Sequence, residues 1–123
     1  MKFREYFLET GTKILLGKNA ENNDELVQKF KGKPNIILHT LAPGSPFCVL
    51  LSDHPLKKEI YEAGIICAAK SQDWRNNKQN IKLHKFSGKD VKKPFFAKSG
   101  TWKIKSKPET ILIKKKDIEK WHQ

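Results

Sequence analysis

The sequence predicts a single α+β domain, in which a mainly antiparallel sheet packs against two principal helices and a short C-terminal helix. Two segments, residues 19–30 and 53–71, repeat apolar side chains every three to four positions, which is typical of helices. Short alternating or wholly apolar segments surround them, which is typical of strands. A chain of 123 residues has room for one core, so we assign residues 1–123 to one domain.

The chain begins with a predicted hairpin that leads into the first helix. Residues 3–8 and 13–16 are rich in aromatic and aliphatic side chains and are separated by a turn sequence. Gly17 ends the second strand. Asn19 is expected to cap a helix that runs to about Phe30, because an asparagine side chain accepts a hydrogen bond from a free amide at a helix start.

Two strands and a second helix are expected next. Residues 36–39 and 47–51 read as strands joined by a turn over residues 42–46, and the second strand is apolar throughout, which predicts a central position. The second helix is expected to begin near Asp53, whose carboxylate is a good cap. Small residues around Gly64 predict that this helix lies close against a sheet or another backbone.

The last third of the chain is again expected to form strands. Apolar residues alternate with Lys and His over residues 81–84 and with Lys over residues 102–107, and residues 111–113 continue the pattern. This predicts a sheet with a lysine-rich solvent face. Residues 114–123 are expected to form a short helix whose Trp121 packs onto the domain. The other two tryptophans, Trp74 and Trp102, are expected in the core.

The net charge of +12 is concentrated in one part of the chain. Residues 1–54 carry a net charge of +1 and residues 55–123 carry +11. This asymmetry favours a polyanionic partner, either a nucleic acid or an anionic membrane surface, over lysines that serve solubility alone. The apolar runs are too short to span a membrane, and we expect no membrane partner. Cys48 and Cys67 lie in apolar segments typical of buried free thiols, which favours a cytoplasmic protein.

Most enzyme signatures are absent from the sequence. The two glycines of residues 11–18 have the wrong spacing for a phosphate loop, no dinucleotide motif occurs, and the Cys and His residues are scattered singly. We therefore expect no metal and no cofactor. One catalytic alternative stays open, because triads are assembled in space: Ser45 as nucleophile with His39 and an acid such as Asp53.

Several motifs, in the same order, resemble the NFACT-R domain, the RNA-binding module of NFACT proteins involved in ribosome-associated quality control. The resemblance implies RNA binding, and tRNA is a credible ligand because the family includes forms joined to a tRNA-thiolation enzyme. Pro46 departs from the pattern, since many members carry His or Ser there. The matching residues are Gly17-Lys18-Asn19-Ala20, Asn23, Glu25-Leu26-Val27, His39, Pro43-Gly44-Ser45, Pro55, Ala63-Gly64, Ser71, Trp74, Val91-Lys92-Lys93-Pro94 and Gly100-Thr101-Trp102-Lys103-Ile104.

The predicted function is therefore RNA binding, with tRNA or ribosomal RNA as the partner and the large ribosomal subunit as a further expected contact. The alternative is an RNA-modifying or RNA-cleaving enzyme centred on His39 and Ser45, and the oligomeric state stays open. Phe86 is the aromatic residue expected to stack on single-stranded bases. The expected recognition motif is Gly17, Lys18, Asn19, Asn23, His39, Gly44 and Ser45. The expected basic face is Lys82, His84, Lys85, Phe86, Lys92, Lys93, Lys103, Lys105 and Lys107.

Overall fold

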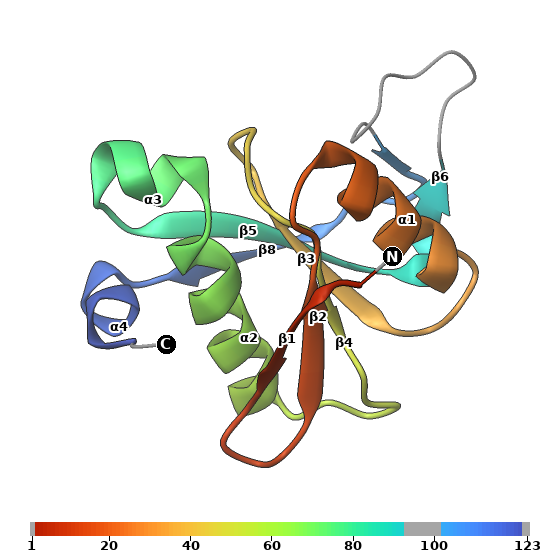
Figure 1. Ribbon diagram of the computed structural model, residues 1–123, viewed down its shortest axis with the longest axis horizontal. Coiled ribbons are helices and arrows are strands. Elements are labelled where there is room, and N and C mark those ends of the chain that lie inside the picture. The colour runs from red at the N-terminus through yellow and green to blue at the C-terminus, as the bar shows by residue number, and fades with distance from the viewer. Residues whose placement is uncertain (1, 93–101, 122–123) are drawn as a thin grey trace.

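The computed structural model describes residues 2–92 and 102–121, and most of them surround one six-stranded sheet (Figure 1). Every neighbouring pair of strands in this sheet is antiparallel, and the order is β1-β2-β4-β3-β5-β8. The strands are β1 (Arg4–Phe7), β2 (Lys13–Leu16), β3 (Ile36–Thr40), β4 (Cys48–Leu50), β5 (Ile81–Ser87) and β8 (Glu109–Ile113). A separate two-stranded sheet pairs β6 (Val91–Lys92) with β7 (Lys103–Ile104).

The six-stranded sheet carries a hydrophobic core on each face, because side chains alternate along its strands. Leu15, Ile37 and Val49 face the core under α1 (Ala20–Phe30). Their chain neighbours Leu16, Leu38 and Cys48 face the other core, which includes α2 (Lys57–Ala69) and Ile118 of α4 (Lys115–Lys120). Two shorter helical segments complete the fold, α3 (Gln72–Asn77) and the 3-10 turn η1 (Gly88–Asp90). The predicted α+β class is confirmed.

The first third of the chain folds as its local sequence predicts. The hairpin forms, and the Asn22 backbone N–H donates to Asn19 Oδ1 at 2.9 Å, so Asn19 caps α1. The helix ends at Phe30, as expected. The strand β4 lies inside the sheet between β2 and β3, which confirms the central position predicted from its apolar sequence.

The expected start of the second helix is wrong. The helix α2 begins at Lys57, four residues after Asp53. The carboxylate that accepts the free Leu56 N–H, at 2.8 Å, belongs to Glu59 in the first turn. Because this carboxylate satisfies the helix start, no cap is needed from Asp53.

Glu59 also ties the helix to the first hairpin. Its carboxylate accepts hydrogen bonds from the hydroxyl groups of Thr10 and Thr12 in the β1–β2 turn. Three donors to one carboxylate lower the pKa of Glu59 to about 2, the Leu56 amide contributing most. In the next turn of α2 the Glu62 carboxylate accepts the Glu9 N–H. We call these contacts the hairpin clamp.

The close approach expected at Gly64 is confirmed. A Cβ atom at this position would lie 2.7 Å from Ile113 Cδ1 and 3.1 Å from Leu83 Cδ1. The predicted helix over residues 53–71 nevertheless ends early, because the Ser71 Oγ accepts the Trp74 N–H at 3.1 Å and begins α3 as a separate helix.

The predicted strand over residues 102–107 is also shorter than expected. Only β7 forms, and it pairs with β6 rather than extending the large sheet. All three tryptophans are half-buried at core edges, Trp74 and Trp121 beside the α2 core and Trp102 beside the α1 core, so Trp74 and Trp102 are less enclosed than predicted. The two cysteines are buried free thiols, as expected.

Candidate functional site

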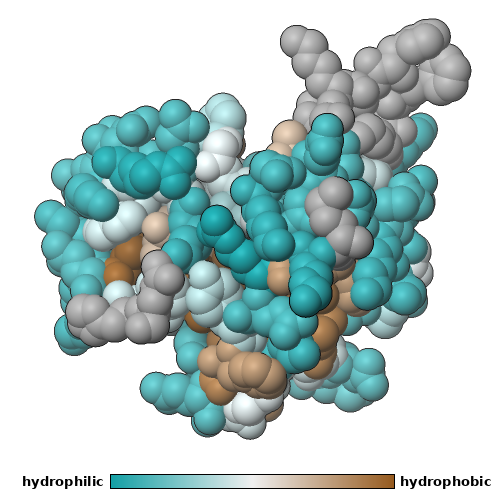
Figure 2. Space-filling view, in the orientation of Figure 1, coloured by the Kyte–Doolittle hydropathy of each residue, from teal (hydrophilic) through white to brown (hydrophobic). Residues whose placement is uncertain are grey.

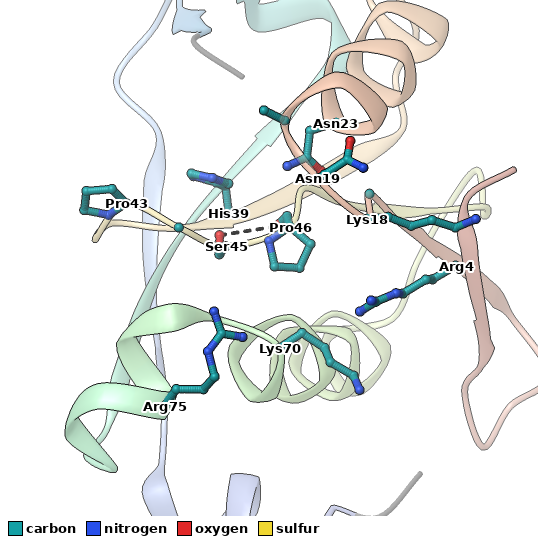
Figure 3. A pocket seen from close by; sticks show the side chains of 13 residues that line it. Arg4, Lys18, Asn19, Asn23, His39, Pro43, Ser45, Pro46, Lys70 and Arg75 are labelled. Carbon is teal, nitrogen blue, oxygen red and sulfur yellow. Dashed lines mark hydrogen bonds between the residues drawn. The ribbon is translucent and has the colours of Figure 1, made fainter. Parts of the chain in front are cut away.

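The seven residues of the expected recognition motif line one cavity of about 430 Å³ (Figure 3). They come from three places that are separate in the sequence: the β2–α1 turn and first turn of α1, the strand β3, and the loop between β3 and β4. These places meet because β4 pairs with both β2 and β3. The residues are Gly17, Lys18, Asn19, Asn23, His39, Gly44 and Ser45.

Two hydrogen bonds to the Phe47 backbone hold the β2–α1 turn against the β3–β4 loop. The Gly17 N–H donates to the Phe47 carbonyl at 3.1 Å, and the Phe47 N–H donates to Asn23 Oδ1 at 3.1 Å. A Cβ atom on Gly17 would lie 1.8 Å from Asn23 Oδ1, so only glycine fits there. Asn23 is therefore a buried structural residue whose amide oxygen is already used.

The β3–β4 loop is also held to the start of α3. The Gln72 N–H donates to the Gly44 carbonyl at 2.8 Å. Gly44 has φ +90°, a conformation that favours glycine, and a Cβ atom there would lie 2.5 Å from Gln72 Oε1. This contact fixes the position of α3, and with it Arg75, beside the cavity.

His39 and Ser45 lie in the same cavity but do not form a nucleophilic pair. The Ser45 Oγ accepts the Thr40 N–H at 3.1 Å and donates to the Pro46 carbonyl at 3.2 Å. Asp53 follows the opposite end of β4 and is not among the residues that line the cavity. The structure therefore does not bring together the serine, histidine and acid of the catalytic alternative.

The His39 ring lies partly buried at the wall of the cavity. It stacks on Phe47 with ring centroids 4.2 Å apart and planes 20° apart. Burial lowers the pKa of His39 to about 4, although hydrogen bonding to backbone groups of Ser45 and Thr40 opposes the shift. The imidazole is consequently neutral at pH 7.

Four cationic side chains surround the cavity, and sequence reasoning identified only one of them. Arg4 comes from β1, Lys18 from the β2–α1 turn, Lys70 from the end of α2, and Arg75 from α3 (Figure 3). Among the described residues, no acidic side chain lines the cavity and no carboxylate forms an ion pair with any of the four. The cavity is therefore a concentrated positive site.

The residues of the expected basic face do not form one surface. Lys82 and His84 of β5 project from the same face of the sheet as His39 of β3, because His84 is the cross-strand partner of His39. Lys85 projects from the opposite face and pairs with Glu109 at 3.4 Å. None of the expected basic-face residues within the described part of the chain lines the cavity. Lys92 and Lys103 are paired in β6–β7, Lys105 and Lys107 follow on exposed backbone, and Lys93 lies outside the described residues.

The expectation that Phe86 is exposed for base stacking is wrong. Its side chain is 7% exposed and lies in the core under α1, edge-on to Phe47. Phe86 does share a strand face with Lys82, but its cross-strand partner is Ile37, which α1 covers. The alternation of side chains along β5 correctly placed Phe86 on the same face as Lys82. Whether Phe86 is exposed was decided by how far α1 covers that face.

A small α+β fold whose cavity is lined by four cationic side chains is typical of a polyanion-binding domain. The profile of the family described as NFACT protein RNA binding domain matches residues 2–106. The chain belongs to this family, which confirms the resemblance seen in the sequence and assigns the domain a general RNA-binding role.

A solved structure has the same fold. The C-terminal region of the fibronectin/fibrinogen-binding protein from Streptococcus suis superposes with a TM-score of 0.83 and 23% sequence identity, over 97% of this chain. The chain spans 48% of that structure. A comparison with curated protein sequences finds no match.

Residues 2–92 and 102–121 hold neither a membrane-spanning helix nor a cluster of metal-ligating side chains. No helix in that part of the chain has the length and apolar character needed to cross a membrane. The same residues contain no group of three or more His, Cys, Asp or Glu side chains placed to hold a metal ion.

Proposed function

We propose that the cavity binds the phosphate backbone of tRNA or ribosomal RNA, and that the domain serves ribosome-associated quality control or tRNA processing. The observation that carries the proposal is the convergence of Arg4, Lys18, Lys70 and Arg75 on a cavity without an acidic lining residue among those described. Since these cations come from four separate elements, only the folded domain presents them together.

The chemistry of the lining suits phosphate more than base edges. The two arginines can each bind a phosphate through two N–H groups, and the two lysines contribute point charges. The amide oxygens of Asn19 and Asn23 are engaged by backbone N–H groups. The contacts therefore supply affinity and orientation, with little reading of base sequence.

The choice of tRNA or ribosomal RNA rests on the family. Its members act in ribosome-associated quality control, and some forms are joined to a tRNA-thiolation enzyme. Both RNAs present folded backbones with closely spaced phosphates, which match a cluster of four cations. Ultraviolet crosslinking followed by sequencing of the bound RNA would distinguish them.

The central test is the salt dependence of RNA binding, measured by fluorescence anisotropy with labelled tRNA and a labelled ribosomal RNA fragment. The logarithm of the association constant should fall with the logarithm of salt concentration by about 0.7 to 0.9 per phosphate contacted. Arg4→Ala and Arg75→Ala should each weaken binding and reduce that slope by about 1. The matched control is Lys31→Ala, which removes an exposed lysine just after the C-terminal end of α1, the end opposite Asn19.

Two results would overturn the proposal. One is an absence of binding to either RNA at low salt. The other is a wild-type slope in both arginine variants combined with a reduced slope in Lys31→Ala, because the phosphates would then lie on another surface.

A further inference from the structure

A second groove, of about 620 Å³, adjoins the cationic cavity. It lies between the end of α2, the helix α3 and the helix α4, and Figure 2 shows a hollow between α3 and α4 with hydrophobic residues at its floor. Lys70 lines both the cavity and the groove, so the two lie on either side of this residue. We call this second site the tryptophan groove, lined by Ala69, Lys70, Trp74, Lys78, Ile118, Glu119 and Trp121.

The tryptophan groove pairs each of its two aromatic rings with an ammonium group. Lys78 Nζ lies 4.8 Å from the ring centroid of Trp74, and Lys70 Nζ lies 5.6 Å from that of Trp121. Both rings are half-buried, so they are positioned by the core yet accessible from the groove. Single-strand binding sites combine aromatic rings that stack bases with cations that hold the backbone. In this groove each ammonium group lies over a ring, so a stacked base would take its place and the lysine would turn to a backbone phosphate.

Lys78 occupies an unusual backbone position. Its φ is 48°, the only positive φ of a residue other than glycine within the described part of the chain. It caps α3, and its N–H donates to the Trp74 carbonyl at 3.1 Å. Glycine would take this left-handed conformation at lower cost, and in this chain the position instead places a lysine side chain over Trp74.

We propose that the tryptophan groove is a base-stacking subsite for unpaired nucleotides of the RNA whose phosphates occupy the cationic cavity. This inference rests on the proposed function and adds to it that the RNA carries a single-stranded segment at this point. Lys70 bridges the two sites, so one strand can pass from the cavity to the groove. The lining of the groove has two lysines and one acidic residue, Glu119, so its net charge is positive and suits a phosphodiester chain.

The test compares two labelled octamers of equal length and charge, oligouridylate and an abasic phosphodiester. Wild-type protein should bind the oligouridylate about tenfold or more tightly, because bases add stacking to the phosphate contacts. Trp74→Leu should weaken binding of the oligouridylate much more than binding of the abasic octamer, so that the preference is largely lost. Trp102→Phe is the matched control: Trp102 packs at the other core, so the preference should persist.

A second measurement does not depend on the folding of the Trp74 variant. In Trp102→Phe protein the remaining tryptophans are Trp74 and Trp121, and oligouridylate should quench their fluorescence while the abasic octamer should not. Equal affinity for the two octamers, or no quenching at saturation, would overturn the groove proposal. If the groove proposal fails in this way but Arg75→Ala lowers the affinity for both octamers equally, the proposed phosphate-binding function stands.

Discussion

Replacing Gly17 with alanine tests how the wall of the cationic cavity is held together. The new Cβ would lie 1.8 Å from Asn23 Oδ1 and 3.0 Å from Asn23 Cα. The amide must therefore leave its place, and the buried Phe47 N–H loses the oxygen that accepts it. Leaving a buried donor unsatisfied costs about 1–3 kcal/mol, and the overpacking adds to this. We expect a loss of about 2–3 kcal/mol, which lowers the melting temperature by roughly 10 °C.

A double-mutant cycle with Asn23→Ala isolates the proposed cause. Asn23→Ala alone should cost about 2 kcal/mol, because it also removes the acceptor for Phe47 N–H. Once Gly17→Ala has displaced the amide, removing that amide should cost little more. The double variant should therefore fall short of the sum of the single effects by at least about 1 kcal/mol. It should still be less stable than wild type, since the contact with Asn23 Cα persists.

Urea denaturation followed by tryptophan fluorescence measures these free energies, with the denaturant slopes compared to confirm that each variant unfolds in one step. If the two single effects add to within about 0.5 kcal/mol in the double variant, the steric account of Gly17 is wrong. A Gly17→Ala protein as stable as wild type would refute it directly.

Three further predictions concern acid stability and helix packing. The pKa of Glu59 is lowered to about 2, so the Glu59 carboxylate should stabilise the fold above its ordinary pKa of about 4.5, and this contribution should be lost as the pH falls toward 2. Glu59→Gln should therefore flatten the curve of unfolding free energy against pH in this range. The control Glu9→Gln changes an exposed side chain and should leave the curve as it is. The pKa of His39 is lowered to about 4, so on acidification the imidazole is protonated in the unfolded chain at a higher pH than in the folded protein. The free energy of unfolding should therefore fall as the pH drops from about 6.5 to 4. An NMR titration of the His39 ring in the folded protein with a midpoint near 6.5 would contradict this. Gly64→Ala should destabilise the protein by about 1 kcal/mol, since overpacking against Ile113 outweighs the gain in helix propensity. Ile113→Val, which removes the Cδ1 atom concerned, should reduce that cost in thermal melts, and an equal cost in both backgrounds would exclude the proposed clash.

The elements that the sequence predicted well are those decided by neighbouring residues. The capped helix from Asn19 to Phe30 depends on one side chain at its start and on the spacing of its own apolar residues. The start of α2 depends on Glu59, which accepts the Leu56 N–H three residues back and is held in place by Thr10 and Thr12, about 50 residues away. A pattern read along the chain therefore placed the cap at the nearest suitable carboxylate, Asp53.

The residues of the candidate site also fall into two groups, those that the sequence indicated and those that only the fold brings together. The motif residues could be grouped because they resemble those of a family, and the structure places all seven in one cavity; their contact with RNA stays a prediction. Arg4, Lys70 and Arg75 carry no local signal, because only the strand order and the contact between Gly44 and α3 bring them to Lys18. Charge counting pointed to the second half of the chain, whereas the cavity takes two of its four cations from residues 1–54.

The hairpin clamp holds the hairpin whose first strand carries Arg4, one of the four cations that line the cavity. Arg4 stands on β1, the outermost strand of the sheet, which has β2 as its one strand partner. At the far end of the same hairpin, Glu59 anchors the turn to α2 through Thr10 and Thr12. The hairpin is thus held to α2 at its turn and carries the Arg4 guanidinium group near its other end, where Arg4 pairs with Leu16 of β2. None of the clamp residues lines the cavity, so we expect a change that loosens this turn to alter the cavity only by displacing Arg4 with its strand.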